Sequence, residues 1–184
     1  MKNLSVWIAA SLILIANPLR AETFTNTNDD ENGKSFGQLM SWVFDGEKSP
    51  DKIKIETSDQ WRTLTDEDES YAVWIGHATY LINNGDINIL TDPIFSKRAS
   101  PIGFAGPKRM IPPVMSMNDL PKIDVVVVSH NHYDHLDMYS LKKLHKINSE
   151  TIFLVPVGDG KRLKKAGLTQ VHEMRWWESM EVGR

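Results

Sequence analysis

One short stretch of the chain is the most informative about its fold: Val125-Val126-Val127-Val128-Ser129-His130-Asn131-His132-Tyr133-Asp134-His135. A short, wholly apolar run of β-branched residues is typical of a strand buried on both faces of a sheet. The polar residues that follow at once predict a loop at the carboxyl end of that strand, where ligand sites form in α/β sheets. The stretch therefore predicts a buried strand that leads directly into a functional site.

The residues of this loop have the composition of a metal site. Alternate residues of an extended segment point the same way, so His130 and His132 can converge on one ion. The chain then turns towards a helix, which lets Asp134 and His135 face a second ion. The chain has no cysteine, so imidazole and carboxylate are the available ligands. Both suit zinc, with iron or manganese as alternatives.

The alternative for this cluster is a solvent-exposed group of histidines or a helix cap, and the buried strand directly before it disfavours that alternative. Four ligands do not complete two catalytic sites, because a catalytic zinc usually has three protein ligands and a water. The remaining histidines are His77, His145 and His172. We expect each of them to be structural, or to support a ligand, rather than to be a ligand.

Outward from the cluster, strands and helices alternate along the chain. Asp137 can cap a helix over residues 138–147, and a second, basic helix over residues 159–166 ends at Gly167. The turn Asn83-Asn84-Gly85-Asp86 predicts a hairpin, because Asn and Gly tolerate the positive φ that it needs. Strands are expected at residues 71–75, 79–82, 87–90, 124–129, 151–155 and 168–172. This order predicts an α/β layered fold.

Residues 94–122 are rich in proline, include Gly103 and Gly106, and show no periodicity, so they predict a long loop that is either functional or disordered. The loop contains Lys97, Arg98, Lys108 and Arg109. Lys108 and Arg109 could receive a substrate phosphate, and the alternative is an ordinary solvated face.

The N-terminal third of the chain resembles an export signal followed by a linker. Lys2 precedes an apolar run over residues 4–16, which is short for a membrane span, and cleavage is expected after Ala21. The alternative is an uncleaved anchor. Residues 22–70 are expected to form a linker and docking segment, with a short helix over residues 36–43 and Trp61 as a buried anchor. Export predicts a bacterial periplasmic or extracellular location.

Composition sets the class of protein. The 184 residues have room for one domain, and 41% hydrophobic with 24% charged residues indicate a globular chain. A net charge of −3 and a pI near 6.1 give no electrostatic reason to expect a nucleic-acid partner.

A set of short motifs appears in one order along the chain: Trp74-Ile75-Gly76-His77-Ala78-Thr79, Thr91-Asp92-Pro93-Ile94-Phe95-Ser96, Ala99-Ser100-Pro101, Gly106-Pro107-Lys108-Arg109, Leu120-Pro121 and Ser129-His130-Asn131-His132-Tyr133-Asp134-His135-Leu136-Asp137. This pattern resembles the branch of the metallo-β-lactamase superfamily typified by N-acylphosphatidylethanolamine-hydrolysing phospholipase D. The resemblance runs from about residue 71 to residue 177.

The resemblance implies an αββα sandwich, of which this chain supplies the first half over residues 71–184, with two metals at one edge. It implies that His130 and His132 bind the first metal and that Asp134 and His135 bind the second. Asp92 would orient a metal-bound histidine, the alternative being turn chemistry before Pro93. His77 would lie near the floor of the site. The family's remaining histidines and bridging aspartate would lie beyond residue 177, so we expect a longer natural protein.

The expected function is metal-dependent hydrolysis of a phosphodiester, such as an N-acyl phospholipid, by a metal-bound hydroxide that Asp134 orients. A lactone or amide hydrolase of the same fold is one alternative, and a truncated, non-catalytic metal-binding fragment is another. Expected partners are a small-molecule or lipid substrate, with peripheral membrane contact conceivable.

Overall fold

The computed structural model describes residues 35, 37–38, 41, 55–64, 70–101, 103–104 and 106–183. The chain divides into two units, Met1–Lys48 and Ser49–Arg184. The expected signal segment, its cleavage point and most of the expected linker lie outside the described residues. No helix in the described part of the chain has the length and apolarity needed to cross a membrane.

The first unit contains the start of the expected short helix. Gly37, Gln38 and Ser41 are helical. The backbone N–H of Ser35 donates to Gln38 Oε1 (2.8 Å), and the backbone N–H of Gln38 donates to Ser35 Oγ (3.2 Å). This reciprocal pair is a capping box, which satisfies two N–H groups at a helix start. The apolar positions of the expected helix lie outside the described residues.

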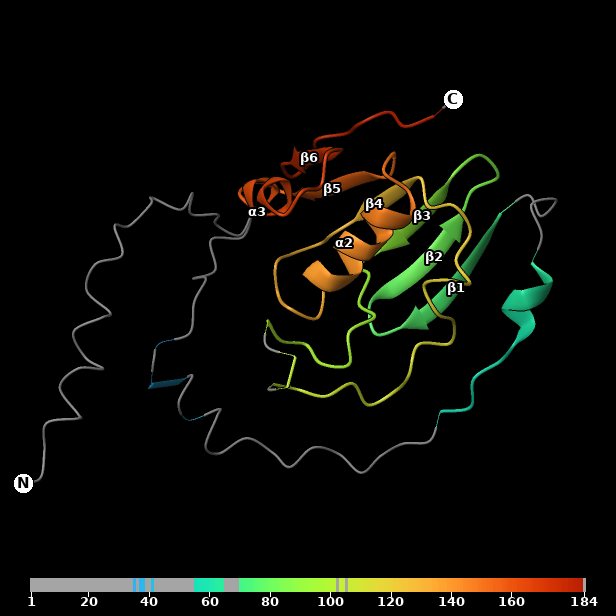
Figure 1. The fold of residues 1–184 in the computed structure, drawn as a ribbon, viewed down its shortest axis with the longest axis horizontal. Helices are drawn as coiled ribbons and strands as arrows, with labels where there is room; N and C mark the ends of the chain where they lie inside the picture. The colour runs from blue at the N-terminus through green and yellow to red at the C-terminus, as the bar shows by residue number, and fades with distance from the viewer. Residues whose placement is uncertain are drawn as a thin grey trace, which may run out of the picture. The chain divides into compact units, whose positions relative to one another are not determined.

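The second unit is built on one mixed sheet with strand order β1-β2-β3-β4-β5-β6 (Figure 1). The strands are β1 (Tyr71–Gly76), β2 (Thr79–Asn83), β3 (Asn88–Thr91), β4 (Val125–Val127), β5 (Ile152–Pro156) and β6 (Val171–Met174). The first three strands pair antiparallel through short turns, and β3 to β6 pair in parallel. Parallel neighbours need crossover connections. The helices α2 (Met138–Ile147) and α3 (Gly160–Lys165) supply two of them.

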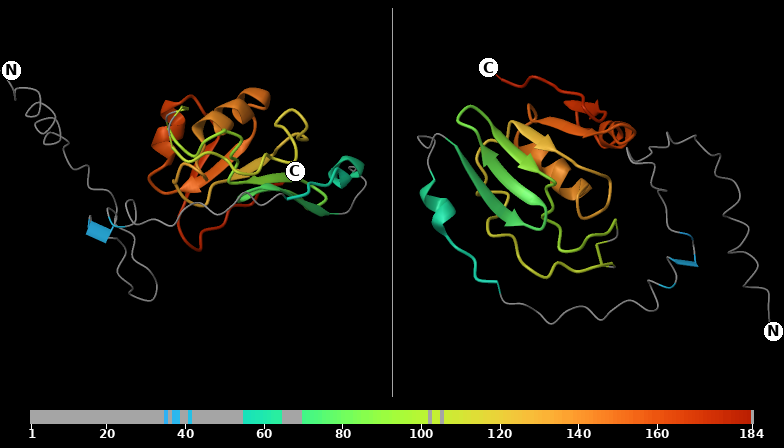
Figure 2. Two further views of the ribbon diagram at one scale, coloured as in Figure 1. Left: turned by 90° about the horizontal axis from the view of Figure 1, so that it is seen from below. Right: turned by 180° about the vertical axis from the view of Figure 1, so that it is seen from behind.

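The core is one row of side chains that runs across the whole sheet, with α2 against it. In register from β1 to β6 the row is Val73, Leu81, Leu90, Val126, Phe153 and Val171. Leu141 and Leu144 of α2 and Leu163 of α3 belong to the same buried cluster. The two views in Figure 2 agree with Figure 1 that α2 covers one face of the sheet. Burial of this apolar row stabilises the sheet that positions the site.

The predicted α/β order is confirmed, and the differences from it are local. The β2–β3 turn has Gly85 at φ 93°, and the Asn84 side chain accepts hydrogen bonds from the backbone N–H groups of Asp86 and Ile87. The last strand begins at Val171 rather than at Leu168. The reason is that the Leu168 N–H donates to the Leu163 carbonyl (3.2 Å) beyond Gly167 at φ 95°, which ends α3.

The segment 55–64 includes the short 3-10 helix η1 (Gln60–Thr63). Trp61 was expected to be a buried anchor. It is partly buried and packs against the core cluster.

The third crossover, between β3 and β4, is a long loop whose order comes from polar contacts. Within it, residues 97–99 pair with residues 107–109: the Ala99 N–H donates to the Pro107 carbonyl (3.0 Å) and the Arg109 N–H to the Lys97 carbonyl (2.9 Å). The Arg109 guanidinium donates to the backbone carbonyls of Ile94, Ser96 and Ile111. These contacts hold the described residues on both sides of Arg109 near the end of β3.

Candidate metal centre

The histidine cluster occupies the connection from β4 to α2. The chain reverses tightly there, with the N–H groups of His135 and Leu136 both donating to the His132 carbonyl (3.0 and 2.8 Å). Asp137 then caps α2: its Oδ1 accepts from the Tyr139 N–H (3.1 Å). The turn places the side chains of this short segment at the carboxyl edge of the sheet, as the sequence predicts.

The structure brings His130 and His132 together. His130 Nε2 and His132 Nδ1 lie 3.1 Å apart. Two imidazole nitrogens on one tetrahedral zinc ion lie about 3.3 Å apart, given zinc–nitrogen distances of about 2.0–2.1 Å. Burial, together with the neighbouring His135 and His132, lowers the pKa of His130. A lowered pKa favours the neutral imidazole, which is the form that binds a metal.

Asp92 supports His135 from the end of β3. It is buried, and its Oδ2 accepts a hydrogen bond from His135 Nδ1 (2.9 Å). The same carboxylate accepts from the backbone N–H of Ser129 and from the Ser129 hydroxyl, both at 2.7 Å. With its Nδ1 occupied by Asp92, His135 presents Nε2 as its free nitrogen. A carboxylate behind an imidazole is the usual way in which proteins orient a metal-binding histidine.

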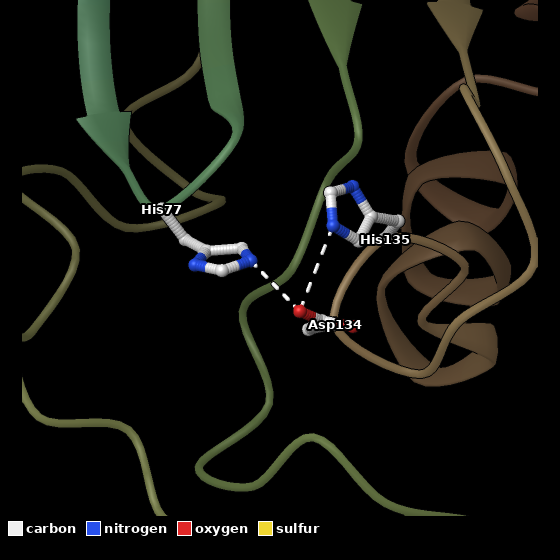
Figure 3. Close-up of side chains that lie close together, drawn as sticks. All are labelled: His77, Asp134 and His135. Atoms are coloured by element: carbon white, nitrogen blue, oxygen red, sulfur yellow. Dashed lines mark hydrogen bonds and ion pairs between the residues drawn. The ribbon is translucent and has the colours of Figure 1, made fainter. Parts of the chain in front are cut away.

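His77, Asp134 and His135 point towards one another in Figure 3. His77 Nε2 lies 3.0 Å from Asp134 Oδ2, and His135 Nε2 lies 3.6 Å from the same oxygen. One potential ligand atom from each of the three residues lies within 4.8 Å of the other two. Partial burial acts to raise the pKa of Asp134, but its own backbone hydrogen bond and the neighbouring His135 and His77 outweigh burial and lower it. Two imidazoles and an ionised carboxylate are a donor set that fits a divalent metal.

Ser129 is a further residue of the centre, which the loop motif did not single out. Its hydroxyl lies between Asp92 Oδ2 (2.7 Å) and His130 Nδ1 (3.0 Å), so it links the carboxylate that supports His135 to His130, an expected ligand of the first metal. Its position in the sequence, directly between the valine run and the first histidine, could have indicated that it lies at the centre.

A cavity of about 450 Å³ adjoins the centre. His77 and Asp134 line one part of it, and Lys108 and Arg109 another. Much of the remaining wall is apolar, from Trp74, Ile94, Pro107, Met110 and Ile111. A second cavity, of about 430 Å³, lies between residues 55–64 and β1 and contains none of the histidines. The first cavity is the one suited to hold a substrate against the metal centre.

The two cations expected to receive phosphate differ in their surroundings. Lys108 is exposed, whereas Arg109 is half-buried and donates to three backbone carbonyls. Burial lowers the pKa of Arg109. Arg109 therefore organises the loop wall, and Lys108 is the freer charge at the cavity.

The other two histidines lie away from the cluster. His145 packs its ring edge against Phe153, with centroids 6.1 Å apart, and His172 is exposed on β6.

Residues 87–184 match the family described as the β-lactamase superfamily domain, and the chain belongs to that family. It is 43% identical over 116 residues to N-acyl-phosphatidylethanolamine-hydrolyzing phospholipase D 1 of Caenorhabditis elegans, covering 60% of this chain and 33% of that protein. It is 37% identical over 113 residues to the mitochondrial N-acyl-phosphatidylethanolamine-hydrolyzing phospholipase D of Saccharomyces cerevisiae, covering 61% and 24%. The family expected from the motifs is confirmed.

Among solved structures, a diiron β-hydroxylase from Streptomyces venezuelae is similar with a TM-score of 0.47 and 26% identity, covering 63% of this chain and 22% of that one. The chain spans a third or less of the length of the two phospholipase D relatives.

Proposed function

We propose that this chain provides the metal-binding part of a metal-dependent hydrolase that cleaves a phosphodiester, such as an N-acyl phospholipid. The observation on which the proposal chiefly rests is the convergence of His130, His132, Asp134 and His135 on one loop, with Asp92 hydrogen-bonded to His135 Nδ1 at 2.9 Å. In this proposal His130 and His132 hold one divalent ion, while Asp134 and His135 hold a second. Zinc is the expected metal, with iron or manganese as alternatives.

Two bound metals would supply a hydroxide nucleophile at neutral pH by lowering the pKa of water. The protein's own side chains have the supporting tasks. Asp92 holds the tautomer of His135, with Nε2 free for coordination. Asp134 lines the cavity, and the neighbouring His135 and His77 help to lower its pKa, so it would stay ionised and could orient the hydroxide.

The choice of substrate rests on the cavity and on the relatives. Its apolar wall suits an acyl chain, and the exposed Lys108, with Arg109 behind it, suits a phosphate. The two relatives are named as enzymes that hydrolyse N-acyl-phosphatidylethanolamine. The same proposal includes peripheral contact of the whole protein with a membrane surface.

The test is a substrate panel assayed with and without metal. The chain would be loaded with zinc, iron or manganese and offered phosphodiesters, lactones and amides, with the chelator-treated chain as control. Phosphodiester cleavage that disappears on chelation supports the proposal. Activity that survives complete metal removal refutes it, and cleavage of lactones or amides alone favours the alternative hydrolase. Metal binding with no activity favours a non-catalytic fragment.

Export to the periplasm is a separate part of the proposal and rests on the pattern of residues 1–21. Fractionation of bacterial cells that express the chain with a C-terminal tag tests it. Tagged protein confined to the cytoplasm would refute it.

A further inference from the structure

We propose that His77 is a third protein ligand of the metal position formed by Asp134 and His135. This inference rests on the metal centre proposed above and adds a ligand that the loop motif alone does not contain. His77 comes from the turn between β1 and β2, far from the cluster in sequence, and Figure 3 shows its ring directed at Asp134.

The distances between ligand atoms are close to those of a coordination shell. In a tetrahedral site with metal–ligand distances of about 2.0–2.2 Å, neighbouring ligand atoms lie about 3.3–3.6 Å apart. The distances to Asp134 Oδ2 are 3.0 Å from His77 Nε2 and 3.6 Å from His135 Nε2. The remaining separation, between the two histidines, is at most 4.8 Å. The His77 side chain is 48% exposed, so a small rotation can shorten that separation without disturbing the core.

The backbone at residue 77 indicates that its side chain is needed there. His77 has φ 54°, a left-handed conformation that glycine or asparagine adopts more readily. Three non-glycine residues of the described chain have positive φ, and two of them, His77 and Asp92, lie at this centre. Strained backbone of this kind gathers at functional sites because the surrounding structure holds it in place.

Hydrogen bonds hold the turn of His77 against the end of β3. Trp74 Nε1 donates to the His77 carbonyl (2.8 Å), and Thr91 Oγ1 donates to the Ala78 carbonyl (2.8 Å). Thr79 Oγ1 in turn donates to the Asp92 carbonyl (2.7 Å). The turn that presents His77 is therefore tied to the residue that orients His135, which fixes the two imidazoles relative to one another.

The competing explanation is that His77 only donates a hydrogen bond to Asp134 and never touches the metal. His77→Cys separates the two possibilities directly. The chain has no cysteine, so a thiolate-to-cobalt charge-transfer band in the near ultraviolet can arise only if residue 77 coordinates Co²⁺. The variant would be kept reduced and titrated with Co²⁺ alone, beside a His172→Cys control on exposed β6.

We expect the charge-transfer band in His77→Cys and not in His172→Cys. A second variant, His77→Asn, keeps a residue that tolerates the left-handed backbone, so it should fold at least as stably as the unsubstituted chain without metal. Its affinity for Co²⁺ at this position should nevertheless fall by about 100-fold or more, which is at least the upper end of the loss seen when an outer partner of a ligand is removed. His172→Asn should bind Co²⁺ normally.

The outcomes distinguish this inference from the proposed function. If the unsubstituted chain shows the ligand-field bands of bound Co²⁺ while His77→Cys lacks the charge-transfer band and His77→Asn binds with unchanged affinity, His77 is not a ligand and the proposed centre stands without it. If the unsubstituted chain binds no Co²⁺, both the inference and the proposed metal centre are overturned.

Discussion

Asp92→Asn tests the support behind His135 with the smallest possible change. Asp92 is 6% exposed and accepts three hydrogen bonds, two from Ser129 and one from His135 Nδ1. Its φ of 36° is one that asparagine tolerates, so the turn before Pro93 is preserved. The substitution therefore separates support of the metal site from simple turn chemistry.

The expected magnitude follows from the tautomer of His135. The new amide presents an N–H group to His135 Nδ1 in place of an acceptor, so Nδ1 must give up its proton and Nε2 must take it. A protonated Nε2 cannot bind a metal. Loss of such a support typically costs about 10- to 100-fold in metal affinity, which is about 1.4–2.7 kcal/mol. The metal-free chain should also lose about 1.5–3 kcal/mol of unfolding free energy, because a neutral amide replaces the charged acceptor of these hydrogen bonds.

The assay is a competition titration with Zn²⁺, together with urea unfolding of the metal-free chain. Asp124→Asn is the matched control, since Asp124 Oδ2 also accepts a backbone N–H, from Asn88 (2.9 Å), but at the opposite end of β4. It should lose stability without losing metal affinity. A folded Asp92→Asn chain that binds Zn²⁺ as tightly as the unsubstituted chain would refute the reasoning.

Three further predictions concern the metal, the loop and a buried carboxyl group. Zinc at 100 times its dissociation constant should stabilise the folded chain by about 2.7 kcal/mol. A chelator should therefore lower the melting temperature. An unchanged melting temperature would show that zinc does not stabilise the fold. Arg109→Lys should lower the unfolding free energy by about 1–3 kcal/mol in urea, because one ammonium cannot replace three directed hydrogen bonds to carbonyls. A loss below about 0.5 kcal/mol would argue against this. Burial raises the pKa of Asp159, so its folded form holds the proton more tightly than its unfolded form, and stability falls as pH rises from the ordinary value through the raised one. The unfolding free energy of the unsubstituted chain should therefore fall more than that of Asp159→Asn as pH rises from the ordinary pKa to the raised one. If the two curves of unfolding free energy against pH run parallel, the Asp159 carboxyl does not titrate in this way.

Local sequence signals predict the bounds of some elements accurately. The helix α2 has the bounds predicted for it, 138–147, because its Asp137 cap and its apolar spacing are both local properties. The predicted start of β6 at Leu168 is wrong, because the Leu168 N–H donates to the Leu163 carbonyl at the end of α3. The long loop is predicted to lack regular structure, and the path of its described residues depends on contacts of Arg109 with the carbonyls of Ser96 and Ile94, which lie 13 and 15 residues away and which composition does not specify.

The sequence by itself determined the order of strands and helices, the family and the residues of the cluster, since each depends on neighbouring positions in the chain. Only the tertiary structure decided which side chains meet there. His77 and Asp134 are 57 residues apart and Asp92 and His135 are 43 apart, yet both pairs lie within hydrogen-bonding distance. Parallel pairing of β3 with β4 brings their carboxyl ends to one edge of the sheet, and the β1–β2 turn lies beside them. Such contacts follow from packing, and no pattern within one segment specifies them.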